Sequence, residues 1–162
     1  MTSHLYSPRA VAAYLPGVEP AELRAWRKHG WFPNADARVG VYPGWSTPRL
    51  DRFVEESMAA ARRCFAERGA RLQKTSGTPE WWLADTVRYL GLADIAAAAG
   101  LTGPALWSHY YKGGLSDPDV TIGHANRVAG WSPERARALA DAQGWHFNLA
   151  RLEDTSGLGG AL

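Results

Sequence analysis

Residues 10–45 of the chain read AVAAYLPGVEPAELRAWRKHGWFPNADARVGVYPGW, and residues 94–131 read DIAAAAGLTGPALWSHYYKGGLSDPDVTIGHANRVAGW. The second stretch repeats the first. Equivalent positions share a residue or its chemistry, as in Gly17 and Gly100, Leu23 and Leu106, Gly30 and Gly113, Asp36 and Asp119, and Val39 and Ile122. After a length difference of three residues, both copies end in Gly-Trp-Ser, at 44–46 and 130–132. Two copies are too few for a solenoid, so this internal repeat predicts two similar small domains.

Each copy has the residue order expected of a helix, a turn, a second helix and a hairpin. Gly17 and Gly100 supply a tight turn that joins two helices at a steep angle. Gly30 and Gly113 stand where the C-terminus of the second helix requires a left-handed residue. Two short β-like runs around a glycine-rich turn follow, and they predict a small hairpin.

This order resembles the winged helix-turn-helix proteins of the excisionase and MerR-like families, particularly small regulators of actinobacteria and their phages. The resemblance is carried by the phrase Asp36-Ala37-Arg38-Val39-Gly40 followed by Pro43-Gly44-Trp45, and it covers residues 6–56 and 89–143. It implies a mainly α fold with two winged helix-turn-helix domains, whose wings are small β-hairpins, joined by a long helix. We expect a first winged helix-turn-helix domain at 1–47, a connecting long helix and linker at 48–75, a second helix-turn-helix-like domain with a wing at 76–153, and a flexible tail at 154–162.

The segments outside the repeats also have expected structures. Apolar residues at helical spacing predict one long helix over 48–72, in which Gly69 is the one residue that could interrupt it. Such a helix would span roughly 37 Å and could set the two domains one DNA turn apart. Residues 80–90, EWWLADTVRYL, are predicted to form another helix. Residues 1–6 are expected to be a loose arm.

The net charge of +2 is divided unevenly between the halves of the chain. Residues 1–75 contain 12 Lys or Arg and 7 Asp or Glu, a balance of +5, whereas residues 76–162 contain 6 and 9, a balance of −3. A basic half is typical of a phosphate-binding surface. The acidic half indicates that the second copy can keep the fold without keeping the DNA contacts.

Several function classes are excluded by what the sequence lacks. The single cysteine, Cys64, allows no internal disulfide and fits a reducing cytosol. There is no secretory signal and no apolar run near ~18 residues, so we expect a cytoplasmic protein that does not enter membranes. The five histidines and Cys64 show no metal-ligand spacing, and neither a phosphate-binding glycine loop nor a nucleophile elbow is present. We therefore expect no metal, no cofactor and no enzymatic activity.

Candidate DNA-binding side chains lie on the second helix and the hairpin of the first copy. Leu23 and Trp26 are predicted to point inward, which leaves the cations on the outer face of a helix sized for the major groove. For Arg38, on the predicted hairpin, the resemblance implies contact with the minor groove or the backbone of DNA. The expected DNA-binding residues are Glu22, Arg24, Arg27, Lys28, His29 and Arg38. The alternative is an ordinary solvated helix face, with Lys28 and His29 favouring the helix C-terminus.

The second copy offers a different set of candidates. The expected DNA-binding residues of its helix are Ser108, His109, Tyr111 and Lys112. Asn126 and Arg127 lie near the tip of its hairpin, and both residue types suit bidentate recognition of bases. Trp107 is too large to be exposed without a partner. The alternative is that this domain has become an interaction or packing module.

Three residues of the repeated motif are predicted to be structural. Asp36 resembles a catalytic carboxylate, but because both copies have it we expect it to cap the turn or pair with a nearby arginine. Trp45 and Trp131 are predicted to be core residues beneath the hairpins.

Together these features predict a sequence-specific regulator that binds double-stranded DNA. The first hypothesis is a transcriptional repressor of the phage immunity type that binds an asymmetric site as a monomer. The second is an excisionase, a recombination directionality factor. The third is a protein whose first domain binds DNA while the second binds another protein, such as an integrase or a component of the transcription machinery.

Overall fold

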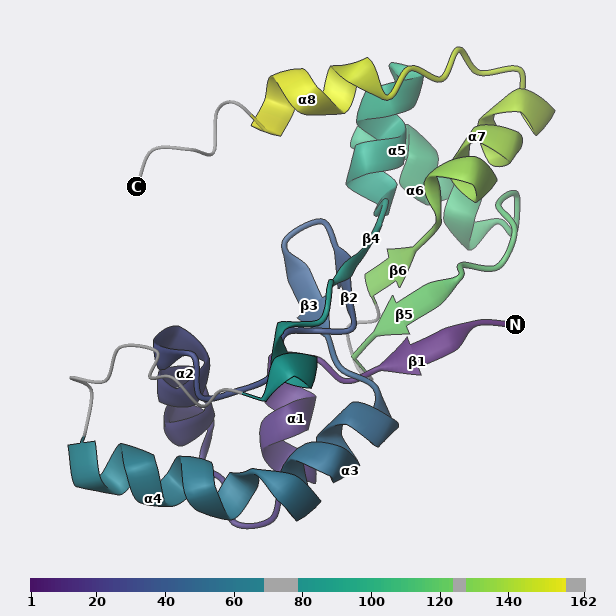
Figure 1. Cartoon of the computed structure of the whole chain (residues 1–162). Coiled ribbons are helices and arrows are strands. Elements are labelled where there is room, and N and C mark those ends of the chain that lie inside the picture. The colour runs from purple at the N-terminus through teal and green to yellow at the C-terminus, as the bar shows by residue number, and fades with distance from the viewer. Residues whose placement is uncertain (69–78, 124–127, 157–162) are drawn as a thin grey trace.

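The computed structural model describes residues 1–68, 79–123 and 128–156. These residues form a mixed α/β fold in which helices predominate, with two three-stranded sheets at its centre (Figure 1). The helices of the first repeat lie on one side of the sheets and those of the second repeat on the other. No helix in the described part of the chain is both long enough and apolar enough to cross a membrane.

The two repeats place equivalent elements in the same order. The elements of the first half are β1 (Ser3–Leu5), α1 (Pro8–Tyr14), α2 (Pro20–His29), β2 (Ala37–Val39), β3 (Tyr42–Gly44), α3 (Thr47–Glu56) and α4 (Met58–Arg68). Those of the second half are the 3-10 turn η2 (Glu80–Leu83), β4 (Val87–Tyr89), α5 (Leu92–Ala99), α6 (Gly103–Tyr111), β5 (Val120–Ile122), β6 (Val128–Gly130), α7 (Pro133–Ala142) and α8 (Ala150–Ser156). Both predicted hairpins are present as antiparallel pairs, β2 with β3 and β5 with β6.

Each repeat donates its first strand to the hairpin of the other. Strand β4 lies parallel to β2, with Arg88 opposite Arg38, and β1 lies parallel to β5, with His4 opposite Thr121. The sheets therefore have the orders β3-β2-β4 and β1-β5-β6. The two predicted domains, 1–47 and 76–153, are consequently linked by exchanged strands.

This exchange corrects two expectations. Residues 1–6 are not a loose arm, because β1 pairs with the edge of the second hairpin. The predicted helix over 80–90 is instead the short turn η2 followed by β4. In both places an unpaired hairpin edge offers backbone hydrogen bonds that a local sequence pattern does not reveal.

The two sheets pack against one another through a small apolar cluster. Its buried members are Val39, Val120 and Ile122, with Leu5, Tyr89 and Val128 around them. The glycines of the Gly-Trp-Ser motif allow this contact: a Cβ at Gly130 would lie 2.5 Å from Val39 Cγ2, and one at Gly44 would lie 2.8 Å from Leu5 Cβ. No side chain fits at either position without displacing the opposite sheet.

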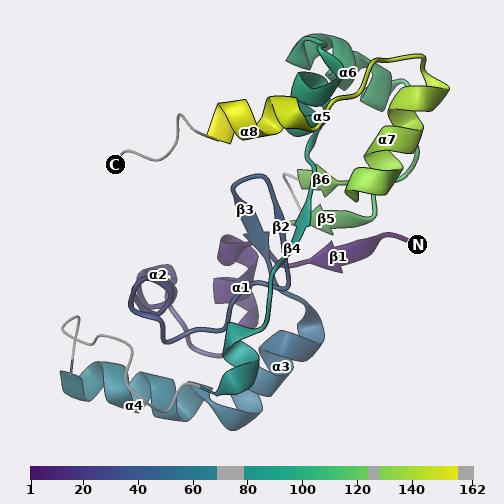
Figure 2. The ribbon, with the colours of Figure 1, turned by 45° about the horizontal axis from the view of Figure 1, so that its top comes forward.

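The long helix expected over 48–72 is two helices. Helix α3 ends at Glu56, Ser57 leaves the helical conformation with φ −135°, and α4 begins at Met58. The apolar face of this pair buries Leu50, Phe53 and Ala61 in the core of the first repeat. The pair therefore covers the first repeat instead of bridging to the second (Figure 2). Residues 69–72 of the predicted helix lie outside the described residues.

Each repeat has its own core, and the motif tryptophans lie in them as predicted. Trp45 is 2% exposed in the first core, and Trp131 is fully buried in the second. Trp82, which precedes β4, also enters the first core and contacts Phe53 at 5.7 Å between ring centroids. Helix α8 reaches Ser156, three residues into the segment expected to be a tail; residues 157–162 lie outside the described part.

Candidate nucleic-acid interface

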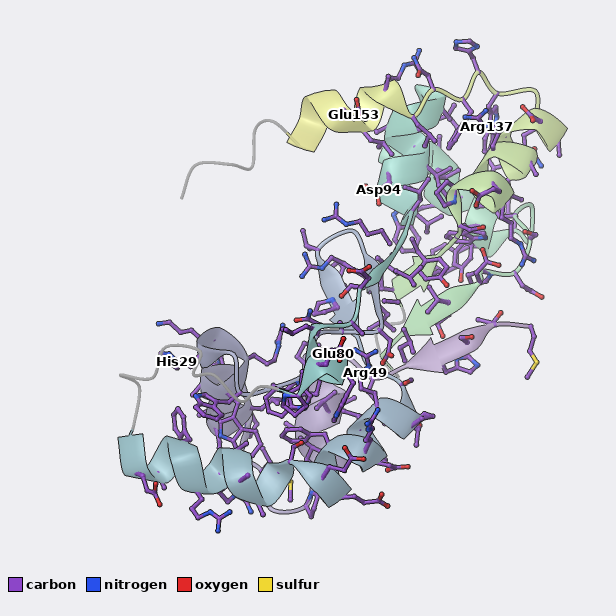
Figure 3. The ribbon with its side chains drawn as sticks, viewed as in Figure 1. His29, Arg49, Glu80, Asp94, Arg137 and Glu153 are labelled. Atoms are coloured by element: carbon purple, nitrogen blue, oxygen red, sulfur yellow. The ribbon has the colours of Figure 1, made fainter. Side chains whose placement is uncertain are left out.

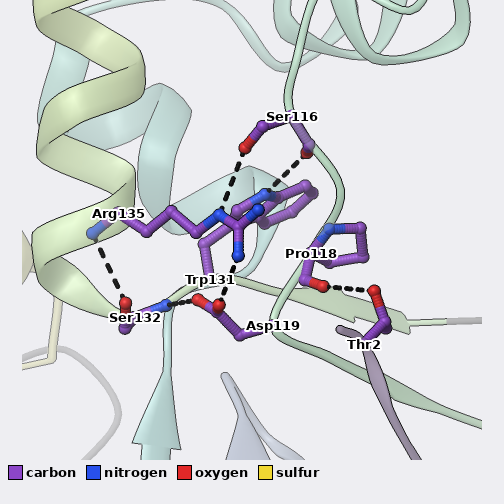
Figure 4. A network of polar contacts seen from close by, with 7 residues as sticks. All are labelled: Thr2, Ser116, Pro118, Asp119, Trp131, Ser132 and Arg135. Atoms are coloured by element: carbon purple, nitrogen blue, oxygen red, sulfur yellow. Dashed lines mark hydrogen bonds and ion pairs between the residues drawn. The ribbon is translucent and has the colours of Figure 1, made fainter.

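A repeated polar network fixes each hairpin to the helix that follows it. Asp36 accepts from the Ser46 backbone N–H at 2.8 Å and pairs with Arg49 at 2.8 Å. In the second repeat Asp119 makes the same two contacts with Ser132 and Arg135, each at 2.8 Å (Figure 4). The structural role predicted for Asp36 is confirmed.

The indoles join the same network. Trp45 Nε1 donates to the Pro33 carbonyl at 3.0 Å, and Trp131 Nε1 donates to the Ser116 carbonyl at 3.1 Å. Burial opposes the ionisation of Asp119, but hydrogen bonds from Ser132 and Arg135 outweigh it and hold the pKa of Asp119 below its usual value. These contacts make the hairpins rigid supports for the residues on their surface.

The cations of α2 stand on its outer face, as expected. Leu23 and Trp26 are buried, whereas Arg24, Arg27 and Lys28 are exposed. The Arg27 guanidinium lies over the Trp45 ring, 5.0 Å from its centroid. Burial, and then the charge of Arg38, lower the pKa of Arg27. The two arginines, one on α2 and one on β2, therefore lie within electrostatic reach of each other.

Arg88 joins these residues from the second repeat. It is exposed and directly opposite Arg38 in the parallel pair β2–β4, so both side chains leave the same face of the sheet. The sequence-based prediction does not include Arg88, because it places residues 80–90 in a helix. A signal was available: residues 86–90, TVRYL, are rich in the β-branched and aromatic residues that favour strands.

Glu22 and His29 do not join the cluster of cations. Glu22 pairs with Arg62 of α4 at 3.2 Å. The His29 ring lies 6.4 Å from that of Phe65, which is also on α4. Figure 3 labels His29 on α2. Both predicted DNA-binding residues thus have their partners on α4.

At the positions equivalent to the cations of α2, the second repeat carries aromatic residues. Arg24, Arg27 and Lys28 correspond to Trp107, Tyr110 and Tyr111. Trp107 and Tyr111 are 44% and 76% exposed and stack at 5.3 Å with 22° between their planes. Tyr110 meets Trp131 edge-on at 5.7 Å, in the place where Arg27 covers Trp45.

The remaining candidates of the second repeat are dispersed or undescribed. Ser108 is exposed on α6, Lys112 is exposed directly after its end, and His109 packs edge-on against Trp145 at 5.3 Å. Thr121, equivalent to Arg38, is buried and hydrogen-bonds to His4 at 2.6 Å. Asn126 and Arg127 lie outside the described residues. The structure therefore shows no counterpart of the arginine cluster in the described part of the second repeat.

An apolar groove of about 780 Å³ separates the first hairpin from α6. The hairpin contributes the exposed Val41 and Tyr42, and α6 contributes the exposed Trp107 and Tyr111. Asp94, at the start of α5 in Figure 3, also lines it. Its wall is made by both repeats.

Comparisons with known proteins identify no relative. No family model matches the chain, and no curated protein or solved structure is significantly similar to it. Within residues 1–68, 79–123 and 128–156, no three His, Cys, Asp or Glu side chains gather as ligands of a metal ion would.

Proposed function

We propose that the chain is a sequence-specific regulator that binds double-stranded DNA in the cytoplasm. In this proposal each repeat is a winged helix-turn-helix domain, with α2 and α6 as the second helices of the motif and the two hairpins as wings. The element order of each repeat supports this assignment, and so does the resemblance of the hairpin phrase to the excisionase and MerR-like families.

One observation carries the proposal: cations gather on one surface without any carboxylate to neutralise them. Arg24, Arg27, Lys28, Arg38 and Arg88 are exposed, and none forms an ion pair within the described residues. Four other arginines, Arg49, Arg52, Arg62 and Arg135, are paired with carboxylates. Arg9, Arg63 and Arg137 are also exposed and unpaired within the described residues, but they lie on three different helices, α1, α4 and α7. Like charges held together repel one another, and a polyanion removes that cost.

The shape of the surface favours duplex DNA among polyanions. An α-helix with exposed arginines is sized for the major groove, where arginine reads guanine by two hydrogen bonds. An arginine on the adjacent hairpin reaches the neighbouring backbone or minor groove. A helix and a hairpin side by side thus combine contacts that select a sequence with contacts that position the protein.

Within this class we propose a transcriptional repressor of the phage immunity type, which binds its site as a monomer. An excisionase that bends DNA beside a recombination site is the alternative from the same resemblance. Both act through the same surface, so the residues named above have the same roles in either.

A second candidate function is favoured by the groove between the first hairpin and α6. Aromatic side chains are enriched in protein–protein interfaces, and a group of exposed ones marks an interaction site. In this candidate the first repeat binds DNA while the second repeat binds a protein, such as an integrase or a component of the transcription machinery.

Selection of bound sequences from random duplex DNA tests the proposal. We expect enrichment of one motif, with an affinity at least about a thousandfold above that for scrambled DNA at physiological salt. The affinity should fall steeply as salt rises, because each neutralised phosphate releases counterions. A protein that enriches no sequence and shows no salt-dependent affinity for duplex DNA would rule the proposal out.

A further inference from the structure

We propose that Arg27, Arg38 and Arg88 form a single phosphate-binding site that is assembled from both repeats, with Arg88 supplied by the second. The inference rests on the proposed DNA-binding function and adds a residue and a dependence to it. Its ligand is a backbone phosphodiester of duplex DNA.

The strand exchange creates the central pair of the site. Arg38 and Arg88 are register partners on parallel strands, and neighbouring strands lie about 4.8 Å apart. Both side chains project from the same exposed face of the sheet. Two guanidinium groups that start this close can reach the oxygens of one phosphate, which arginine binds through paired N–H donors.

Arg27 brings a third guanidinium to the same place from α2. Its position over the Trp45 ring, at 5.0 Å, holds the group by cation–π contact while leaving its N–H edge free for an anion. Trp45 is itself fixed by its hydrogen bond to Pro33. Arg27 is therefore preorganised, and its pKa responds to the charge of Arg38.

Three unpaired guanidinium groups on one face favour an anion as the ligand. Within the described residues, none of the three arginines pairs with a carboxylate. The site is an open face beside the exposed Arg24 and Lys28, and it is not an enclosed pocket for a free ion. An extended surface of this kind fits a duplex whose phosphates continue along the groove.

The second repeat provides an internal comparison. Its equivalents of Arg27, Arg38 and Arg88 are Tyr110, Thr121 and His4. Thr121 is buried and bonded to His4, and Tyr110 packs on Trp131. The same backbone framework thus exists twice, but the arginines are present at only one of its two copies. The strand exchange therefore makes phosphate binding by the first repeat depend on β4 of the second.

Binding of the full chain to a labelled 30-base-pair duplex of mixed sequence tests the site over a range of salt concentrations. Arg88→Gln, Arg38→Gln and the double variant are compared with Arg137→Gln, which removes one exposed charge from α7, well away from the site (Figure 3). Glutamine keeps the first two methylene groups of arginine and a polar end but carries no charge, and thermal melting confirms that each variant folds.

We expect Arg88→Gln and Arg38→Gln each to weaken binding about tenfold, the effect of a lost hydrogen bond to a charged group, and Arg137→Gln to change it less than twofold. If both arginines hold one phosphate, the double variant loses at most about 0.9 from the slope of log affinity against log salt, since Arg27 remains at the site, whereas two separate phosphates would cost about 1.8. Equal binding by Arg88→Gln and Arg137→Gln, or a loss near 1.8 in the double variant, overturns the shared site. If the wild-type chain has no salt-dependent affinity for the duplex, the proposed DNA-binding function itself is wrong. The wild-type measurement alone shows this result and so distinguishes it from failure of the shared site.

Discussion

At the scale of single residues, the repeated motif is explained by contacts that each copy makes. Asp36 and Asp119 tie a hairpin to the following helix, and the motif tryptophans fill the two cores. The glycine before each tryptophan has a different reason, because it lies where the two sheets meet. The motif therefore encodes both the fold of each repeat and the contact between repeats.

The glycine contact yields a stability prediction. Gly130→Ala should lower the free energy of unfolding by about 1–3 kcal/mol, because the new methyl group overlaps Val39 and forces the sheets apart. Gly103→Ala is the matched control, since a Cβ there meets nothing within 4 Å and alanine favours the helix that begins at this residue. Urea unfolding measures both. Equal stability of Gly130→Ala and wild type would mean that the sheets are not in close contact.

A second residue-scale prediction concerns acid stability. Because the pKa of folded Asp119 is lowered, its ion pair stabilises the protein above the unfolded pKa, and that contribution is lost as pH falls through the folded pKa. Asp119→Asn keeps an acceptor for Ser132 but removes the charge opposite Arg135. We expect the variant to be less stable than wild type at neutral pH and the difference to shrink below about pH 4. Thermal melting of both proteins at each pH from 7 to 3 measures the difference in stability. A difference that stays constant over this range would mean that the ion pair does not depend on ionisation of Asp119.

At the scale of elements, the sequence predicted what is local and missed what is exchanged. The helices around Gly17 and Gly100 and both hairpins follow from glycine positions and apolar spacing, and they are present. Strands β1 and β4 could not be predicted in the same way, because three residues carry little periodicity and their partners lie more than 45 positions away. The break at Ser57 was hidden because the apolar residues on either side keep their helical spacing.

The same limit applies to the candidate site. Arg24, Arg27, Lys28 and Arg38 could be found from the repeat, since burial of Leu23 and Trp26 fixes which face of α2 is free. Arg88 could not be placed beside Arg38 without the pairing of β4 with β2. The prediction from the sequence includes Glu22 and His29 because the sequence of the helix does not show α4, on which both residues have their partners.

Helices α2 and α6, the second helix of each repeat, should differ in what they contribute to DNA binding. Arg24→Ala with Lys28→Ala should weaken binding by at least tenfold and lower the salt slope by about 1.8, because two exposed cations are removed. Trp107→Ala with Tyr111→Ala removes the equivalent pair from α6 and should leave DNA affinity within about twofold. Titrations on a selected sequence compare the two. A large loss in the aromatic variant would show that α6 also reads DNA, and would remove the reason to propose a protein partner for it.

At the scale of the whole molecule, the strand exchange changes how the halves can be studied. Removing residues 76–162 to isolate the first repeat would also remove β4 from the first sheet and Trp82 from the first core. Loss of DNA binding after such a truncation would therefore say nothing about which repeat contacts DNA. Point substitutions on the intact chain, such as those above, keep both sheets complete.

The exchange also bears on the number of chains that occupy one DNA site. Regulators with one helix-turn-helix per chain usually dimerise on a palindrome, because two equal readers require two equal half-sites. Here exchanged strands already join the two repeats within one chain. Their equivalent helices carry different side chains, cations on α2 and aromatic residues on α6. The predicted helix of roughly 37 Å is instead α3 and α4, which cover the first repeat. A single chain per site is therefore expected from the inequality of the repeats alone. We predict one 17.7 kDa chain per selected, non-palindromic duplex, measured by sedimentation of the complex. Two chains on a palindromic site would contradict it, because each chain would then be using only its first repeat.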